Sequence, residues 1–396
     1  MIKGAADTAG GAYESFGRRP SATVPLLLRL NSPSETLLIV VATLVGISIV
    51  MMFSLNPLFG EISFAAKFVR HLLFISVSLS VAFLVYLVGA EKLLTFHKLI
   101  FIVCAIALIF VFIPPLGGCI RGAARWLSFG SFHFQPSELA KLVVALLAAK
   151  LATEKNRGSI SFKQFLLKAV LPVTVLTFLV LIEPDFGSAM FLLFISMVFF
   201  FVAGIPLRHI LLTLLFLSLL TVPIAVLKLE HVRSRVSEFL SEESDYLGRG
   251  YQPRQSLIAL GSGGVVGRGL GASRQKLMFL PDRDTDFIFA IIGEEMGFCG
   301  AASVLLLFVV YFICSLQISI KVQDAPLQVL AFAASFVPTA QALMNIAVVS
   351  ASVPTKGISL PFVSFGGSSL LVNFIWVALL VSIAKISDER RTSCEE

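Results

Sequence analysis

The chain has 396 residues, of which 57% are hydrophobic and only 14% are charged. A soluble globular protein carries about 25% charged residues, so this composition excludes a soluble multidomain protein. The 36 Phe against 5 Tyr and 2 Trp leave most aromatic surface without a polar group, which suits helices that face lipid or one another. Membrane topology explains the net charge of +7 more simply than nucleic acid does, and we expect no nucleic-acid partner.

Ten stretches of the chain are apolar over about the 20 residues that a helix needs to cross a bilayer. We therefore predict an all-α integral membrane protein with about ten transmembrane helices. These form one membrane domain at 36–385, between polar tails at 1–35 and 386–396. The predicted spans are 36–54, 69–89, 98–116, 136–152, 164–182, 186–205, 207–228, 286–314, 328–350 and 367–385.

Lys and Arg are concentrated in the tails and in the loops on the same side, which predicts that both termini are cytoplasmic. This orientation places a large extracytoplasmic loop, 229–285, between helices 7 and 8. Within it, Val232–Tyr246 has the pattern of an amphipathic surface helix, and Gln255–Leu260 that of a short helix before a Gly-rich turn. The loop at 117–135 lies on the same side, so we expect the chemistry at the outer face.

Glu138 and Lys141 are the first charged residues at predicted membrane depth. The apolar run that follows them is too short to cross alone, so the span must include both. Their i, i+3 spacing puts them on one face of the helix, where they can neutralise each other. Charges at this depth are costly and are usually retained for function. A structural ion pair between helices is the alternative.

Two acidic residues, Glu183 and Asp185, lie in a tight turn between the fifth and sixth predicted spans. Asp185 is placed to cap the next helix, and capping accounts for it as well as a functional role does. Glu183 ends an apolar run, where a capping role does not explain it.

Three carboxylates, Asp282, Asp284 and Asp286, crowd the start of the eighth predicted span. One acidic residue at a helix N-terminus is explained by the helix dipole, but three exceed that need. Crowding and partial desolvation raise the pKa of a carboxyl group, which is how a general base is made. We expect the first turns of this long helix either to stand outside the hydrocarbon or to kink at Gly293, Gly297 or Gly300; in both cases Asp286 lies at the outer interface.

A segment rich in Gly, Ser and Pro, 356–369, precedes the last predicted span. Non-helical backbone at membrane depth is tolerated only where it lines protein or a wet cavity. Gln341 and Asn345, one turn apart on the preceding helix, share a face and are candidates to line the same cavity. Helix packing is the alternative role for these two amides.

These motifs together resemble the SEDS family (shape, elongation, division and sporulation) of integral membrane peptidoglycan glycosyltransferases. The matching segments keep the order and spacing of the family and cover all ten spans. Two of them, SRQKLMFLP and PTKGISLPF, look like the division-type FtsW branch more than the elongation-type RodA branch. The matching segments are 124–141, 183–189, 250–281, 285–298 and 354–370.

The resemblance implies polymerisation of lipid II at the outer face of the cytoplasmic membrane, with inversion and release of undecaprenyl pyrophosphate. Asp286 then corresponds to the catalytic base of the family. The other candidate residues bind substrate or shape its cavity: Arg125, Glu138, Lys141, Asp185, Gln341, Asn345, Ser364, Gly366 and Gly367. Among them, Arg125 and Lys141 offer positive charge to the diphosphate leaving group.

The chain departs from the family pattern near the base. Asp282 and Asp284 replace the usual Glu and His, and Phe365 replaces a Tyr. The extra negative charge of Asp284 would raise the pKa of Asp286 or create a metal site. Asp284 and Asp286 are therefore candidate ligands for a divalent cation, Mg²⁺ or Mn²⁺, although no cofactor is certain.

The resemblance also implies partners and a location. The partners are a class B penicillin-binding protein, whose transpeptidase cross-links the new strand, and other division proteins; the location is the inner membrane at the division septum. Two other functions stay open on the sequence alone. A flippase that moves lipid II across the bilayer would share the intramembrane charges and the broken segment. A scaffold that recruits division proteins through its tails would tolerate the loss of those charges.

Overall fold

The computed structural model describes residues 32–55, 62–114, 117–120, 123–130, 132–156, 158, 160–228, 250–277, 279–354 and 357–395. Each of the ten predicted spans coincides with a helix or with consecutive helices in these ranges. Six of the described helical segments are long and apolar enough to cross a membrane, and three further apolar helices are shorter. The predicted amphipathic helix at Val232–Tyr246 lies outside the described residues.

The chain is a multi-pass helical membrane protein, as the sequence predicts. The element bounds are α1 Pro33–Ser54, α2 Ile62–Val88, α3 Ala90–Thr95, α4 His97–Phe110, α5 Pro136–Asn156, α6 Phe162–Phe165, η3 Leu166–Val170, α7 Leu171–Ile182, α8 Phe186–Val202, α9 Leu207–Lys228, α11 Tyr251–Gly263, α12 Ile288–Lys321, α13 Ala325–Val349 and α14 Gly367–Glu395.

Local sequence explains several helix starts. A capping box opens α1, because the Ser32 hydroxyl accepts from the Glu35 amide while the Glu35 carboxylate accepts from the Ser32 amide. Pro136 begins α5 at a position where the missing N–H costs nothing. Asp185 caps α8 by accepting from the Ser188 amide at 3.1 Å, so its predicted capping role is confirmed.

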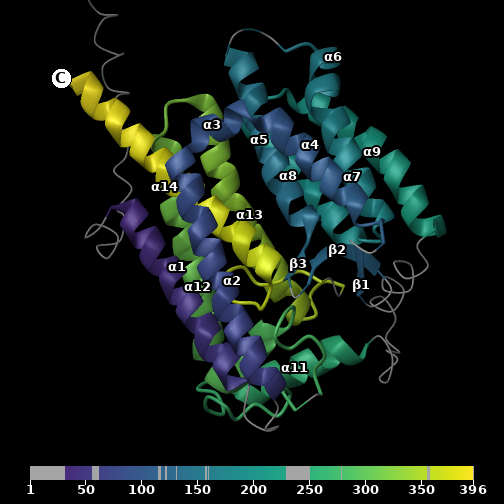
Figure 1. Cartoon of the computed structure of the whole chain (residues 1–396), viewed down its shortest axis with the longest axis vertical. Coiled ribbons are helices and arrows are strands. Elements are labelled where there is room, and N and C mark those ends of the chain that lie inside the picture. The colour runs from purple at the N-terminus through teal and green to yellow at the C-terminus, as the bar shows by residue number, and fades with distance from the viewer. Residues whose placement is uncertain are drawn as a thin grey trace, which may run out of the picture.

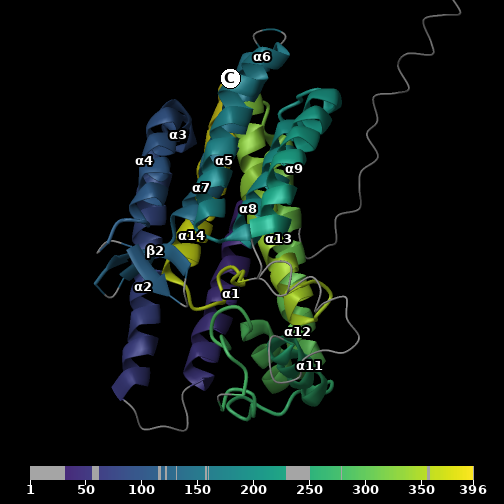
Figure 2. The same cartoon turned by 90° about the vertical axis from the view of Figure 1, so that its right-hand side faces the viewer.

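Three helices, α5, α13 and α14, form the centre of the bundle (Figure 1). α5 packs against α13, α4 and α8, and α14 packs along α2. α12 contacts α13, α1 and α11. In Figure 2 the irregular segments before α12 and α14 lie between the bundle and α11, towards the same end of the molecule. The irregular backbone of the predicted site therefore gathers at one end of the bundle.

The region 117–135, which the sequence indicated only as a loop, contains a small sheet. β1 Gly117–Ile120, β2 Ala123–Phe129 and β3 Phe132–Phe134 pair in that order, and both pairings are antiparallel. Gly130, at the end of β2, has φ +62°. A residue with a side chain rarely adopts this backbone conformation, so the turn towards β3 favours glycine. The sheet joins α4 to α5 and holds Arg125 on its central strand.

The 34-residue helix α12 is broken at Gly297, which has φ 68° and ψ −167°. The kink predicted for Gly293, Gly297 or Gly300 is therefore at Gly297. It frees the carbonyls of Glu294 and Glu295, which accept from the amides of Arg268 and Gly269 at 3.1 and 3.0 Å. The Gly-rich segment after α11 thus takes the hydrogen bonds that the helix loses.

Candidate functional site

Asp286 lies in a turn directly before α12. The Asp282 carbonyl accepts from the amides of Thr285 and Phe287, both at 3.1 Å, and so closes the turn. The side-chain amide of Asn345, on α13, donates to the Asp286 carbonyl at 2.7 Å. Asp286 is half-buried, whereas Asn345 is only 1% exposed. The predicted base is thus held by its own turn and by a buried amide from another helix.

The non-helical segment predicted before the last span is present and passes beside Asp286. A Cβ added to Gly357 would lie 3.2 Å from Asp286 Oδ2, so the backbone there comes close to the carboxylate. Ser364 donates to the Thr285 carbonyl at 2.6 Å and accepts from the Leu360 amide at 2.8 Å. This segment therefore forms one wall of the Asp286 site.

A lysine that the sequence did not single out reaches this turn. The Lys67 ammonium, from α2, forms an ion pair with the Asp284 carboxylate and lies 5.2 Å from the centre of the Phe365 ring. The Phe365 amide donates to the Asp284 carbonyl at 2.8 Å. Lys67, Asp284 and Phe365, from three separate segments, are thus in contact.

Glu138 and Lys141 form the predicted pair on one face of α5, with 2.7 Å between Lys141 Nζ and Glu138 Oε1. Both are buried, at 7% and 4% exposure. The ammonium also lies 5.4 Å from the centre of the Phe191 ring of α8. The pair therefore places a compensated charge inside the bundle, where bare charges are costly.

A second polar group surrounds the turn between α7 and α8. The Arg125 guanidinium donates to the carbonyls of Glu183 and Pro184, and its Nη1 lies 3.9 Å from Asp185 Oδ1. Gln135 Nε2 lies 3.5 Å from Asp185 Oδ2. Arg125 and Asp185, predicted from separate motifs, are therefore brought together.

Glu183 is fully buried beside this group. Neither of its carboxylate oxygens has a hydrogen-bond partner among the described residues. Burial raises the pKa of Glu183 to about 9; Asp185 adds to the rise and Arg125 opposes it. At neutral pH Glu183 therefore carries a proton, and the Arg125 charge is left to face Asp185.

Two serines at the start of α14 lie between the Arg125 group and the segment beside Asp286. The Gln135 amide donates to Ser368 Oγ at 2.8 Å, and Ser359 donates to Ser369 at 2.8 Å. The α14 backbone comes close to α2 at Gly367, where an added Cβ would meet the Phe74 ring at 3.3 Å. Gly366, one residue earlier, joins the non-helical wall to α14. Ser368 thus contacts Gln135 of the Arg125 group, and its neighbour Ser369 contacts the segment beside Asp286.

Gln341, the other predicted amide, lies one turn before Asn345 on α13 and is 1% exposed. It shares the buried face of α13, as its spacing predicts.

The described side chains do not favour the divalent-cation site considered for Asp284 and Asp286. Among the described residues no group of three or more His, Cys, Asp or Glu side chains could hold a metal ion. The Asp284 carboxylate already faces the Lys67 ammonium. The cation site stays a prediction.

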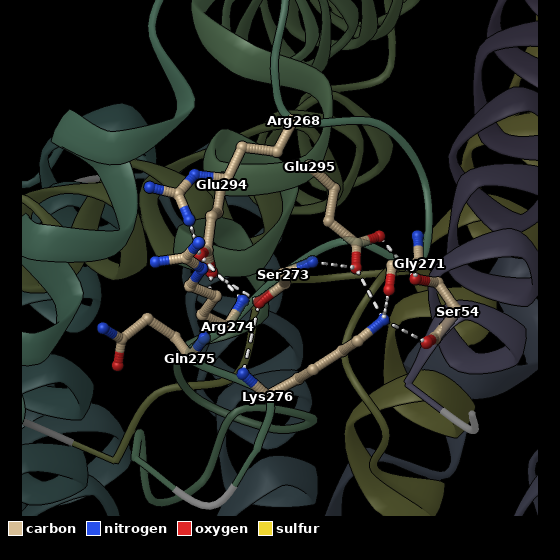
Figure 3. A network of polar contacts seen from close by, with 9 residues as sticks. All are labelled: Ser54, Arg268, Gly271, Ser273, Arg274, Gln275, Lys276, Glu294 and Glu295. Atoms are coloured by element: carbon tan, nitrogen blue, oxygen red, sulfur yellow. Dashed lines mark hydrogen bonds and ion pairs between the residues drawn. The ribbon is translucent and has the colours of Figure 1, made fainter. Parts of the chain in front are cut away.

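A second buried polar network surrounds Glu294 and Glu295, directly before the α12 kink at Gly297 (Figure 3). Lys276 donates to Glu295 at 3.1 Å and to the Ser54 carbonyl at 2.9 Å. Glu294 accepts from the hydroxyl of Ser273 and from the amide of Arg274, the latter at 2.9 Å. Lys276 and both glutamates lie in the segments 250–281 and 285–298 that carry the family resemblance, but nothing in their spacing indicates that they meet.

Comparison with known proteins places the chain in a family. The FtsW/RodA/SpoVE family model, described as "Cell cycle protein", matches residues 35–389. The chain belongs to the FtsW/RodA/SpoVE family. It is similar to Stage V sporulation protein E of Bacillus subtilis (strain 168), with 34% identity over 90% of this chain and 98% of that protein.

Other members of the family have names that state an activity. The chain is 35% identical to the probable peptidoglycan glycosyltransferase FtsW of Geobacter metallireducens, over 71% of this chain and 75% of that protein. It is 33% identical to the protein of the same name from Coxiella burnetii, over 86% of this chain and 93% of that protein.

Solved structures of the FtsW/RodA/SpoVE family share this fold. A chain of a peptidoglycan synthase complex described as coordinating polymerization and crosslinking has a TM-score of 0.71, 28% identity, and coverage of 89% of this chain and 97% of that chain. Thermus thermophilus RodA has a TM-score of 0.65 at 24% identity, over 88% of this chain and 95% of that chain. The helical arrangement described above is thus the family fold.

Proposed function

We propose that the chain is a peptidoglycan glycosyltransferase that polymerises lipid II at the outer face of the cytoplasmic membrane during cell division. The observation that carries the proposal is the placement of Asp286. Its turn is held by a buried amide from α13, and its carboxylate lies beside the non-helical 357–366 segment. The names of the relatives, glycosyltransferases among them, support the assignment.

In the proposed reaction Asp286 is the general base. It takes the proton from the 4-hydroxyl of the acceptor GlcNAc, and that oxygen attacks the anomeric carbon of the donor MurNAc with inversion. The bond to undecaprenyl pyrophosphate breaks, and the electron pair leaves with the diphosphate. A half-buried carboxylate with hydroxyls and backbone around it suits this step, because a base works best when it is positioned and partly desolvated.

The leaving diphosphate needs positive charge as it departs. Arg125 and Lys141 are proposed to supply it. The guanidinium of Arg125 is fixed by two carbonyls, and Lys141 is held by Glu138. Both groups are thus oriented before a substrate binds, and an oriented charge needs little reorganisation during the reaction.

The partners and the orientation belong to the same proposal. A class B penicillin-binding protein is the proposed transpeptidase partner, in line with the neighbour described as part of a complex for polymerization and crosslinking. Both termini are proposed to be cytoplasmic, and the protein to act at the septum with other division proteins. Protease protection of tags at each end in inverted vesicles would test the orientation.

The test is a polymerisation assay with purified protein in detergent, lipid II, and the transpeptidase partner present or absent. The wild type is expected to give a glycan ladder on a gel, and Asp286→Asn none. Asp282→Asn, in the same turn, keeps the carbonyl that closes it and is the matched control, which should still polymerise. A ladder from the Asp286 variant would remove that residue from the mechanism.

A flippase is the competing function, favoured by the buried Glu138–Lys141 pair and the broken helix α12. The detergent assay separates the two functions, because a detergent solution has no bilayer for a substrate to cross. A wild type that makes no ladder there, but moves labelled lipid II across a vesicle membrane, would favour transport.

A further inference from the structure

The strongest unassigned feature of the site is the contact between Lys67 and the turn that carries Asp286. Lys67 comes from α2, far from the turn in sequence, and its ammonium pairs with the Asp284 carboxylate. Asp284 is two residues from Asp286, and its side chain is only 16% exposed. A carboxylate buried to this degree near another would repel it strongly if nothing compensated its charge.

Phe365 completes the contact from the opposite wall. Its ring centre lies 5.2 Å from the Lys67 ammonium, a distance at which the ring face attracts a cation. Its amide donates to the Asp284 carbonyl at 2.8 Å, so the backbones of the two residues are held together. The ring of Phe365 also lies near His71 and Phe74, with centroids 5.8 Å away in each case.

The geometry points to Lys67 as a positioning residue, an internal counter-ion that cancels the Asp284 charge and ties the Asp286 turn to α2 and Phe365. This inference rests on the proposed function, because the base that it serves is Asp286.

The alternative is that this is a surface ion pair of little consequence. The Lys67 side chain is 44% exposed, and exposed ion pairs contribute little to stability. Three observations argue against that view. The Asp284 side chain is mostly buried, the Phe365 ring lies against the Lys67 ammonium, and the backbone of Asp284 is hydrogen-bonded to that of Phe365. The prediction that separates the two views concerns turnover rather than stability.

A double-mutant cycle with Lys67→Met, Asp284→Asn and the combined variant tests the inference in the polymerisation assay. Lys67→Met leaves the Asp284 carboxylate uncompensated, and kcat is expected to fall about tenfold. A factor of this size lies within the range of interaction energies measured between residues in contact. Asp284→Asn should cost little. The combined variant should recover to within about threefold of the wild type, because neither charge remains.

A conservative variant and a matched control separate positioning from general stability. Lys67→Arg should keep most of kcat. The control is the Lys168–Glu154 pair, 2.8 Å apart with side chains 49% and 30% exposed, changed to Met and Gln in the same cycle. It should shift the thermal midpoint about as much as the Lys67 cycle without a change in kcat.

Each outcome decides between the two views. The inference would be overturned if the combined variant were as slow as Lys67→Met. It would also be overturned if Lys67→Met changed kcat no more than the variants of the control pair do. A wild type without any glycan product would instead overturn the proposed function. The thermal-midpoint cycle would then judge the pair by itself: coupling between positions 67 and 284 supports it, and additive shifts refute it.

Discussion

The side-chain amide of Asn345 donates to the Asp286 carbonyl and to the Ile358 carbonyl, at 2.7 Å in each case. An amide nitrogen carries two hydrogens, so both are used. One buried side chain on α13 thus joins the turn that carries the predicted base to the segment that forms the wall beside it. It acts together with two other links between these parts, the hydrogen bonds from Ser364 to the Thr285 carbonyl and from the Phe365 amide to the Asp284 carbonyl.

Asn345→Leu is expected to lower both stability and activity. It leaves two carbonyls without their donor, at a cost of about 2–6 kcal/mol in total, and it removes one of the links that hold the wall against the turn. Thermal unfolding in detergent and the glycan assay measure the two effects. Asn373→Leu is the control, because that equally buried amide bonds only within its own helix among the described contacts, to Ser369. Equal loss of kcat in both variants would contradict the role assigned to Asn345.

Lys276→Met is expected to destabilise the protein by about 3–5 kcal/mol, because it leaves the Glu295 carboxylate buried without its cation. Adding Glu295→Gln should restore a large part of this loss, since the remaining charge is then removed. Differential scanning fluorimetry and limited proteolysis of the segment 264–277 would report it. If the double variant unfolds at or below the temperature of the single variant, the ion pair is not the source of the stability.

The raised pKa of Glu183 predicts a dependence of stability on pH. Its pKa is about 9 in the folded protein against an ordinary value of 4.5. Between these values the folded state binds the proton and the unfolded state does not, so this residue's contribution to stability falls as pH rises from about 5 to about 9. Glu183→Gln should flatten that part of the curve of thermal midpoint against pH. Parallel curves for the two proteins would show that the carboxyl does not titrate in this way.

Two glycines on α11 provide a matched test of close packing. A Cβ on Gly263 would lie 1.9 Å from the Gly293 carbonyl of α12, whereas a Cβ on Gly261 would meet nothing within 4 Å. Gly263→Ala should force α11 away from α12 and cost at least about 1–3 kcal/mol, as overpacking does. Gly261→Ala should be neutral or stabilise by up to about 1 kcal/mol, because alanine is the better helix former. The reverse order of thermal midpoints would contradict this packing.

Much of the fold followed from the sequence because long apolar runs leave few alternatives in a membrane. The ion pair of Glu138 and Lys141 and the cap at Asp185 depend on neighbours within a few residues, so helical spacing and capping preference predict them. The break of α12 was expected only at one of three glycines, because the distant amides of Arg268 and Gly269 take part in it. The non-helical segment before α14 was equally visible, because Pro and Gly exclude a helix there.

The contacts between distant segments could not be predicted in the same way. Nothing in the local pattern indicates that Lys67 reaches Asp284, or that Asn345 binds the backbone at Asp286. The small sheet at 117–134 was missed because its strands are short and one pairing contains an irregularity between Gly118 and Cys119. The burial of Glu183 depends on how the turn packs, and its sequence position shows only that it ends an apolar run.

The order in which these contacts arise has a consequence for biogenesis. Ser48 of α1 donates to the Val363 carbonyl at 2.7 Å. The contacts of Asp286 likewise involve later parts of the chain, Asn345 and the segment at 357–366. A chain that emerges from the ribosome and inserts from its N-terminus, as nascent chains do, therefore holds its early helices without their final partners until nearly the whole protein has been made. Truncations that remove only the last span should lose the wall beside Asp286, and quality-control proteases would meet such chains as incomplete bundles.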